Sequence, residues 1–294
     1  MFPKGEFSTA MAQPKIIRTI KEMHAASREF IKQGKTIGFV PTMGALHAGH
    51  TSLVERAAKE NDAVVVSIYV NPTQFGAGED FDKYPRTLDA DVKLCGDAGA
   101  DVIFAPENLY GKEPRTFVNV GELDEPLCGM SRPGHFRGVA TVVAKLLNIV
   151  IPDRAYFGRK DAQQLLIIET LVRDLNFGCE IVPCEIVREA DGLAMSSRNR
   201  YLSPSERKQA LAISKALNYC RTKVEQGERD AMKLIGEMAE ILEQQPNLEI
   251  DYVAIVDAHN LADLKRVRGD VLAAIAAKVG TTRLIDNARL EGID

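Results

Sequence analysis

An apolar strand-like stretch that leads through a turn into a helix with two histidines limits the possible folds of this chain more than any other feature. The stretch IGFV at 37–40 is followed by PTMGALHAGH at 41–50, and 51–61 has helical patterning. The start of a helix offers free backbone N–H groups to an anion. Residues three apart share one helix face, so His47 and His50 are expected to face one ligand, and Gly49 would admit it close to the backbone. Two histidines alone could simply cap a helix, but the whole unit predicts a site for an anion such as ATP.

Strands and helices alternate through the first two thirds of the chain. We expect helices at 15–33, 51–60, 87–98, 138–149 and 161–175, and strands at 36–40, 63–70, 101–105, 155–157 and 180–187. This alternation predicts an α/β fold with a Rossmann-like, doubly wound parallel sheet. Ligands of such sheets bind beyond the carboxyl ends of the strands. The histidine turn, the loop that starts at Asn71 and the segment at Gly158 all follow such ends.

The pattern changes after Pro204. Helices are expected at 205–226 and 230–244, a strand at 250–256 and a strand-rich segment at 271–285. We therefore expect a Rossmann-like nucleotide-binding domain over 13–188 and a smaller C-terminal α/β lid domain over 189–294. Residues 1–12 lack periodicity and are expected to be a disordered leader.

Composition narrows the possible functions. The chain has 37 basic and 41 acidic residues among 294, a formal net charge of −4, which gives no electrostatic attraction to nucleic acid or to an acidic membrane. No apolar run approaches the roughly 20 residues that span a bilayer, and the N-terminus lacks a secretory signal. Five scattered cysteines without CxxC spacing argue against disulfides and structural zinc. These features predict a cytoplasmic protein with free thiols and small-molecule substrates.

A second informative segment, GLAMSSRNR at 192–200, lies where the two predicted domains meet. By itself it reads as a solvated linker. Together with the upstream histidine motif it resembles the HIGH and KMSKS signatures of the nucleotidyltransferase superfamily, whose members attack ATP at its α-phosphate and release pyrophosphate. A mobile loop that brings Arg198 and two serine hydroxyls to the triphosphate would stabilise charge as pyrophosphate departs.

The resemblance extends to one family. The stretches PTMGALHAGH, SIYVNPTQFG, GHFRGV, YFGRKDAQQL and AMSSRNRYLS are similar, in order and spacing, to the pantoate–β-alanine ligases, and the match runs from about Lys15 to the C-terminus. The family implies that pantoate and ATP form pantoyl adenylate and pyrophosphate, after which β-alanine attacks the adenylate to give pantothenate and AMP. It also implies a homodimer.

The resemblance further implies the site residues. It places catalysis on His50, and His47, Lys160, Ser196 and Arg198 are the further catalytic candidates. Because an anionic carboxylate must approach an anionic phosphate, we expect His47, His50, Lys160, Arg198, the helix N-terminal amides and Mg²⁺ to neutralise charge. It assigns pantoate and β-alanine contacts to Gln74 and Gln164, with Asn71 positioning the same loop. It assigns ATP binding to Met43, Gly44, Ala45, Leu46, His47, Ala48, Gly49, His50, Gly158, Arg159, Lys160, Asp161, Val187, Met195, Ser196, Ser197 and Arg198. Arg159 replaces a Glu that the family often has, which could alter phosphate contacts.

The sequence leaves open the roles of three residues and two alternative functions. Asp89 and Asp91 are candidate Mg²⁺ ligands, although we favour the interpretation that both are ordinary exposed acids of a helix, and His135 is expected to be structural. An enzyme that transfers AMP to a phosphate acceptor would need extra cations, which the loop 71–82 lacks. A nucleotide-binding regulator need not combine His50, Lys160 and Arg198.

Overall fold

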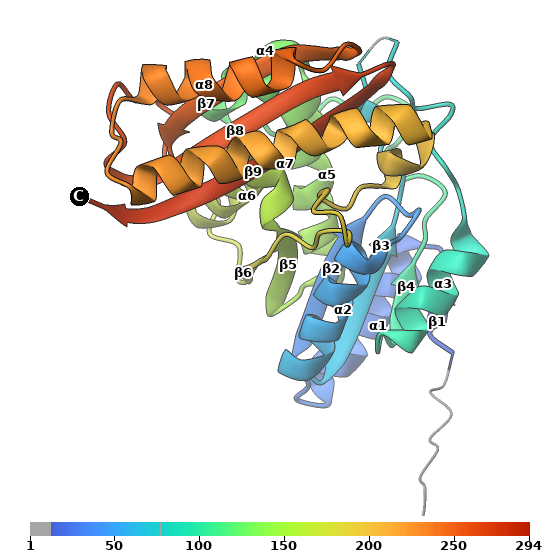
Figure 1. The fold of residues 1–294 in the computed structure, drawn as a ribbon. Coiled ribbons are helices and arrows are strands. Elements are labelled where there is room, and N and C mark those ends of the chain that lie inside the picture. The colour runs from blue at the N-terminus through green and yellow to red at the C-terminus, as the bar shows by residue number, and fades with distance from the viewer. Residues whose placement is uncertain (1–12, 77) are drawn as a thin grey trace, which may run out of the picture.

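Six parallel strands form the larger of two sheets in the computed structural model, which describes residues 13–76 and 78–294 (Figure 1). Their order in the sheet is β1-β4-β3-β2-β5-β6, and every neighbouring pair is parallel. The strands are β1 (Lys15–Ile17), β2 (Ile37–Thr42), β3 (Ala63–Ile68), β4 (Val102–Phe104), β5 (Arg154–Gly158) and β6 (Glu180–Cys184).

Helices cover both faces of this sheet, because strands that are apolar throughout must be buried on both sides. On one face, α1 (Ile20–Lys32), α5 (His135–Val150) and α6 (Ala162–Asp174) pack into one core cluster. On the other face, α2 (Ala48–Glu60) and α3 (Leu88–Asp97) pack into a second cluster. The predicted doubly wound α/β fold is confirmed.

The strand order places a topological switch point between β2 and β5. From β2 the chain proceeds to β3 and β4 in one direction, and it then returns to add β5 on the opposite side of β2. Ligands of open α/β sheets bind in the crevice at such a point. The histidine turn follows β2, and the short helix η3 (Arg159–Asp161) follows β5, so both lie at this crevice.

The C-terminal part forms a smaller layer of helices on an antiparallel sheet, drawn in orange and red in Figure 1. The sheet order is β7-β8-β9, and two helices pack with it around a separate core. The elements are η4 (Ser197–Tyr201), α7 (Pro204–Glu225), α8 (Ala231–Glu243), β7 (Leu248–Asp257), β8 (Gly269–Val279) and β9 (Thr282–Ile293). A smaller C-terminal domain is thus confirmed, while the boundary at 188/189 stays a prediction and the expected leader 1–12 lies outside the described residues.

The main correction concerns the N-terminus. The helix expected over 15–33 is wrong at its start, because residues 15–17 form β1 and pair with β4 at the sheet edge. The helix begins only after Thr19, whose Oγ1 accepts a hydrogen bond from the N–H of Glu22 at 3.2 Å and caps α1. Three residues are too few to show the alternation of a strand. Further on, α5 begins at His135, earlier than expected, and β6 ends at Cys184.

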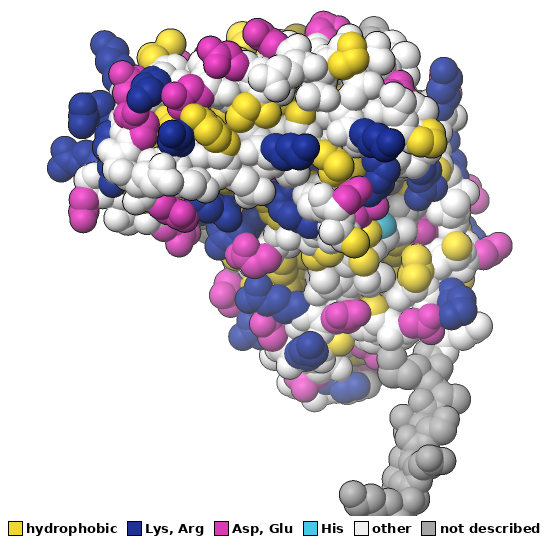
Figure 2. All heavy atoms as spheres, in the orientation of Figure 1, with side chains coloured by type: hydrophobic (Ala, Val, Ile, Leu, Met, Phe, Trp, Pro, Cys, Tyr) yellow, Lys and Arg dark blue, Asp and Glu magenta, His cyan; other side chains and the backbone are white. Residues whose placement is uncertain are grey.

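Short elements connect these layers around the crevice. They are η1 (Pro72–Gln74), η2 (Gly121–Asp124) and α4 (Cys128–Ser131). Within the described ranges, no helix has the length and apolar character needed to cross a membrane. On the face shown in Figure 2, acidic and basic side chains are interspersed over both domains.

Candidate active site

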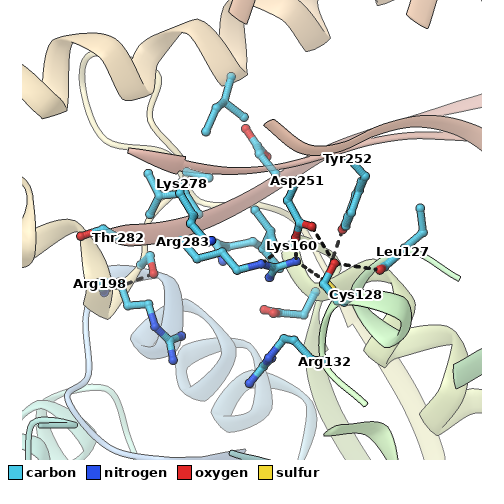
Figure 3. A pocket seen from close by; sticks show the side chains of 18 of the residues that line it. Leu127, Cys128, Arg132, Lys160, Arg198, Asp251, Tyr252, Lys278, Thr282 and Arg283 are labelled. Atoms are coloured by element: carbon cyan, nitrogen blue, oxygen red, sulfur yellow. Dashed lines mark hydrogen bonds and ion pairs between the residues drawn. The ribbon is translucent and has the colours of Figure 1, made fainter. Parts of the chain in front are cut away.

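A cavity of about 1020 Å³ lies between the two domains at the switch point. Cationic side chains from separate parts of the chain point into it (Figure 3). The cations labelled there are Arg132 before α5, Lys160 on η3, Arg198 on η4, and Lys278 and Arg283 on the C-terminal sheet, and Lys83 also lines the cavity. Of the residues assigned from the sequence, the cavity wall contains Lys160, Asp161, Gln164, Ser196 and Arg198, while His47, His50, Asn71 and Gln74 lie outside the set of lining residues.

The histidine turn is built as a helix start. His47 is the N-cap of α2, and its Nδ1 accepts a hydrogen bond from the N–H of Gly49 at 3.1 Å. The proton of the neutral ring is therefore on Nε2, which leaves that nitrogen as a donor. The ring of His50 lies 4.1 Å from that of His47, centroid to centroid. Ligand access was the reason expected for Gly49, and the structure adds a second one: a Cβ there would come within 2.9 Å of the His47 ring.

Both histidines are neutral at pH 7. Burial, with a smaller contribution from nearby Lys160, lowers the pKa of His47 to about 4. Burial, followed by the neighbouring His47, lowers the pKa of His50 to about 3. Neither ring is therefore a cation at pH 7, so the positive charge near the turn comes from Lys160 and Arg198, and neutralisation of phosphate charge by the two histidines stays a prediction.

Asp91 supports this turn from α3. Its carboxylate is 2% exposed and accepts hydrogen bonds from the N–H groups of Ala45 (3.0 Å) and Leu46 (2.9 Å). Thr87 Oγ1 donates to the same carboxylate at 3.2 Å. These bonds occupy the carboxylate and stabilise a turn in which Ala45 has a positive φ of 52°. Asp91 is thus neither the exposed acid nor the Mg²⁺ ligand that the sequence allowed, and it holds the turn in place.

Asn71 and Gln74 form a buried amide pair beside the turn. Asn71 Nδ2 donates to Gln74 Oε1 at 3.0 Å and to the carbonyl of Gly138 at 3.1 Å. Gln74 Nε2 lies 2.9 Å from Met43 Sδ, which joins this loop to the histidine motif. Asn71 thereby positions the loop, while Gln164 lines the cavity from α6.

The junction loop closes against the same region. The N–H of Met195 donates to the carbonyl of Val187 at 3.0 Å, so two segments assigned to ATP meet. Ser196 Oγ accepts from the N–H of Arg198 at 3.2 Å and caps η4. Ser197 is buried, with its Oγ 3.5 Å from the hydroxyl of Tyr84.

Two arginines of the cavity are held by one loop. Arg198 donates to both carboxylate oxygens of Asp80, at 2.8 and 3.1 Å. Arg132 donates to both carboxylate oxygens of Glu79 at 2.7 Å each. His135 bridges Arg132 and the carbonyl of Gln74, which agrees with its expected structural role. Burial, followed by the nearby Arg132, lowers the pKa of His135 to about 4.

Arg159 lies apart from this cavity. Its guanidinium pairs with Glu185 at 3.0 Å, and the residue lines a second, smaller cavity of about 200 Å³. Its side chain therefore does not approach the cationic cluster. Asp89 is exposed and lines neither cavity. Among the residues the structure describes, no group of three or more His, Cys, Asp or Glu side chains is arranged to hold a metal.

Sequence reasoning missed the far wall of the cavity. Arg283 donates to Asp251 at 2.6 Å and lies 3.5 Å from Cys128 Sγ, and the Tyr252 hydroxyl lies 3.2 Å from the same sulfur (Figure 3). These contacts join β7 and β9 to α4 across more than 120 residues of sequence. They depend on how the C-terminal sheet is placed, and no local motif marks them.

The fold and the site together define the class of protein to which this chain belongs. A doubly wound sheet with a His-x-Gly-His helix start and convergent cations at its switch point is typical of α/β enzymes that act on phosphate-bearing substrates. The family model described as pantoate-beta-alanine ligase matches residues 15–289. The chain belongs to this family, and its function is that of a pantoate–β-alanine ligase.

Individual members of the family are similar to this chain over nearly their whole length. A pantothenate synthetase from Acetivibrio thermocellus is 52% identical over 94% of this chain and 99% of its own length. One from Heliobacterium modesticaldum is 54% identical over the same shares. The crystal structure of pantothenate synthetase from Thermus thermophilus superposes with a TM-score of 0.88 at 45% identity, covering 93% of this chain and 98% of that one.

Proposed function

We propose that this chain joins pantoate to β-alanine in two steps at the expense of ATP. In the first step a carboxylate oxygen of pantoate bonds to the α-phosphorus of ATP, and the bond to pyrophosphate breaks. In the second step the β-alanine amine bonds to the acyl carbon, loses a proton, and AMP leaves. The observation that carries the proposal is that Lys160 and Arg198 line one cavity at the switch point and that Lys160 lies close enough to the histidine turn to lower the pKa of both His47 and His50. A relative from Francisella tularensis, 34% identical with a TM-score of 0.76, is described as complexed with beta-gamma ATP and beta-alanine.

Charge neutralisation is the main requirement of the first step, because an anionic carboxylate must approach an anionic phosphate. Lys160 has no ion-pair partner among the described residues, so its ammonium is available to the triphosphate. Arg198 becomes available when phosphate oxygens replace Asp80 in its bidentate contact. His47 donates from Nε2, and the N-terminal amides of α2 add partial positive charge.

Substrate positioning accounts for the remaining assignments. Gln164 on the cavity wall offers a donor and an acceptor to the hydroxyl and carboxylate groups of pantoate without adding charge. Gln74 would serve the same substrate from the Asn71 loop once its contact with Met43 gives way. The second step needs an adenylate shielded from water, and closure of the C-terminal domain over the cavity would provide that shield.

Magnesium fits this site only as an ion carried by the phosphates. Mg²⁺ keeps several waters and needs one or two protein carboxylates in such complexes. Asp161 lines the cavity next to Lys160 and would hold the ion there, where it would supply charge compensation to the phosphates. A homodimer and a cytoplasmic location stay predictions.

Pyrophosphate exchange into ATP tests the proposal. The assay is run with Mg²⁺ and without β-alanine, in the presence and in the absence of pantoate. We expect exchange only with pantoate, because the adenylate must form reversibly. ATP-binding protein that shows no exchange would overturn the two-step route and favour a regulatory nucleotide-binding role, and exchange independent of pantoate would indicate another acceptor.

A further inference from the structure

The C-terminal sheet makes a specific contact with the segment that carries Lys160. Asn287, on β9, donates from Nδ2 to the carbonyl of Arg159 and to the carbonyl of Lys160, at 2.9 Å each. The residues are 127 and 128 positions apart in sequence. One side-chain amide thus uses both of its hydrogens on two consecutive carbonyls of η3.

The preceding residue, Asp286, makes a second contact between β9 and a segment near the cavity. Asp286 is 4% exposed, and its carboxylate accepts both arms of Arg188, at 2.7 and 3.0 Å. Arg188 directly follows Val187, whose carbonyl is bonded to Met195. Two adjacent side chains of β9 therefore contact η3 and the residue that follows Val187, which belong to two of the segments that the family resemblance assigns to ATP.

This arrangement matters because the Lys160 segment has little support from its own neighbours in sequence. Asp161 makes no side-chain cap to α6, so the first turn of the helix lacks the usual local support. Asn287 is 6% exposed, and its place on β9 is fixed by pairing with Ala274 on β8. A rigid strand that anchors a short 3₁₀ turn restricts the backbone from which the lysine side chain extends.

We infer that Asn287 is a positioning residue for Lys160, so that the C-terminal domain forms part of the nucleotide site as well as covering it. The inference rests on the proposed function for the role of Lys160. These two hydrogen bonds couple the position of β9 to the backbone that carries Lys160.

The kinetic test is a double-mutant cycle between Asn287→Ala and Lys160→Ala, measured by pantoate-dependent pyrophosphate exchange. We expect Asn287→Ala to lower the exchange rate constant by about 10- to 100-fold, because a displacement of about 1 Å at a reacting group can cost a hundredfold. In the Lys160→Ala background the same change should have less than about a twofold effect. Exchange near the wild-type rate, or an equal loss in both backgrounds, would overturn the inference.

A second measurement does not depend on turnover. Amine acylation followed by mass spectrometry reports the reactivity of each lysine, and Lys278 on the same cavity wall serves as the internal reference. We expect Asn287→Asp, which has nearly the same shape, to change the labelling rate of Lys160 at least about threefold and to leave Lys278 unchanged, since a carboxylate repels both carbonyls. An unchanged Lys160 rate in this variant would refute the positioning role even if the proposed reaction were absent.

Glu291→Gln is the matched control on the same strand. Its side chain is exposed and pairs with Arg289, away from the main cavity. We expect the Glu291 variant to show exchange and Lys160 labelling at wild-type levels. The thermal unfolding midpoint of every variant distinguishes a loss of folding from a displaced Lys160 in a folded protein. If the wild-type enzyme shows no exchange, the proposed function is refuted. If the wild-type enzyme is active and the Asn287 variants match it in exchange and in Lys160 labelling, only the positioning role is refuted.

Discussion

Substitution of Gly49 by Ala would separate the catalytic geometry of the histidine turn from its stability. An added Cβ would lie 2.9 Å from His47 Cε1, closer than real Cβ atoms approach, and 3.0 Å from His47 Nδ1, which is also unusually tight. The imidazole must swing away, and it then loses its hydrogen bond to the N–H of residue 49. The N-cap loss costs about 1 kcal/mol, and the better helix propensity of Ala returns up to about 1 kcal/mol. The net change in the free energy of unfolding should therefore be within about 1 kcal/mol.

The effect on catalysis should be much larger. Displacing one well-placed donor costs about 3 kcal/mol of transition-state stabilisation, which is roughly a hundredfold in rate. Pantoate-dependent pyrophosphate exchange measures that loss, and urea unfolding measures the stability. Gly236→Ala is the matched control, because Gly236 lies within α8 with nothing within 4 Å of an added Cβ. It should stabilise by about 0.5–1 kcal/mol with no change in exchange. Wild-type exchange in the Gly49 variant would refute the claim that this contact sets the position of His47.

Three further perturbations test other parts of the site. Asp91→Asn should lower the free energy of unfolding by about 2 kcal/mol in urea titrations and slow exchange, because it weakens charge-assisted bonds to two amides of the histidine turn; an unchanged midpoint would contradict this. Because the pKa of His50 falls to about 3 in the folded state, the unfolded state binds more protons below pH 6.5, so stability is lost as pH falls. His50 alone should contribute about 2 kcal/mol of loss between pH 7 and 5, and His50→Gln should remove that part of the pH dependence of the urea midpoint. Asp80→Asn should lower the KM for ATP about three- to fivefold by releasing Arg198, and a raised KM would show that Asp80 instead prepares Arg198 for the nucleotide.

Local chemistry and periodicity were enough to predict a large part of this protein from its residues. Buried parallel strands are apolar throughout and helices repeat every 3.6 residues, so the doubly wound sheet and most helix boundaries could be predicted. The histidine motif was correctly placed at a helix start, since a strand, a turn and a helix follow one another within about 20 residues. The family motifs supplied Lys160 and Arg198, which the structure brings to one cavity.

Contacts between residues remote in sequence became visible only in the folded chain. The strand β1 was missed because three residues carry no periodicity and their pairing partner lies in β4. Asp91 looked like an exposed helix acid, and only the packing of α3 against the histidine turn buries its carboxylate. The anchoring of Lys160 by Asn287 likewise depends on the placement of β9 beside η3. Such contacts follow from the balance of burial and hydrogen bonding over the whole chain, and local residue patterns do not encode them.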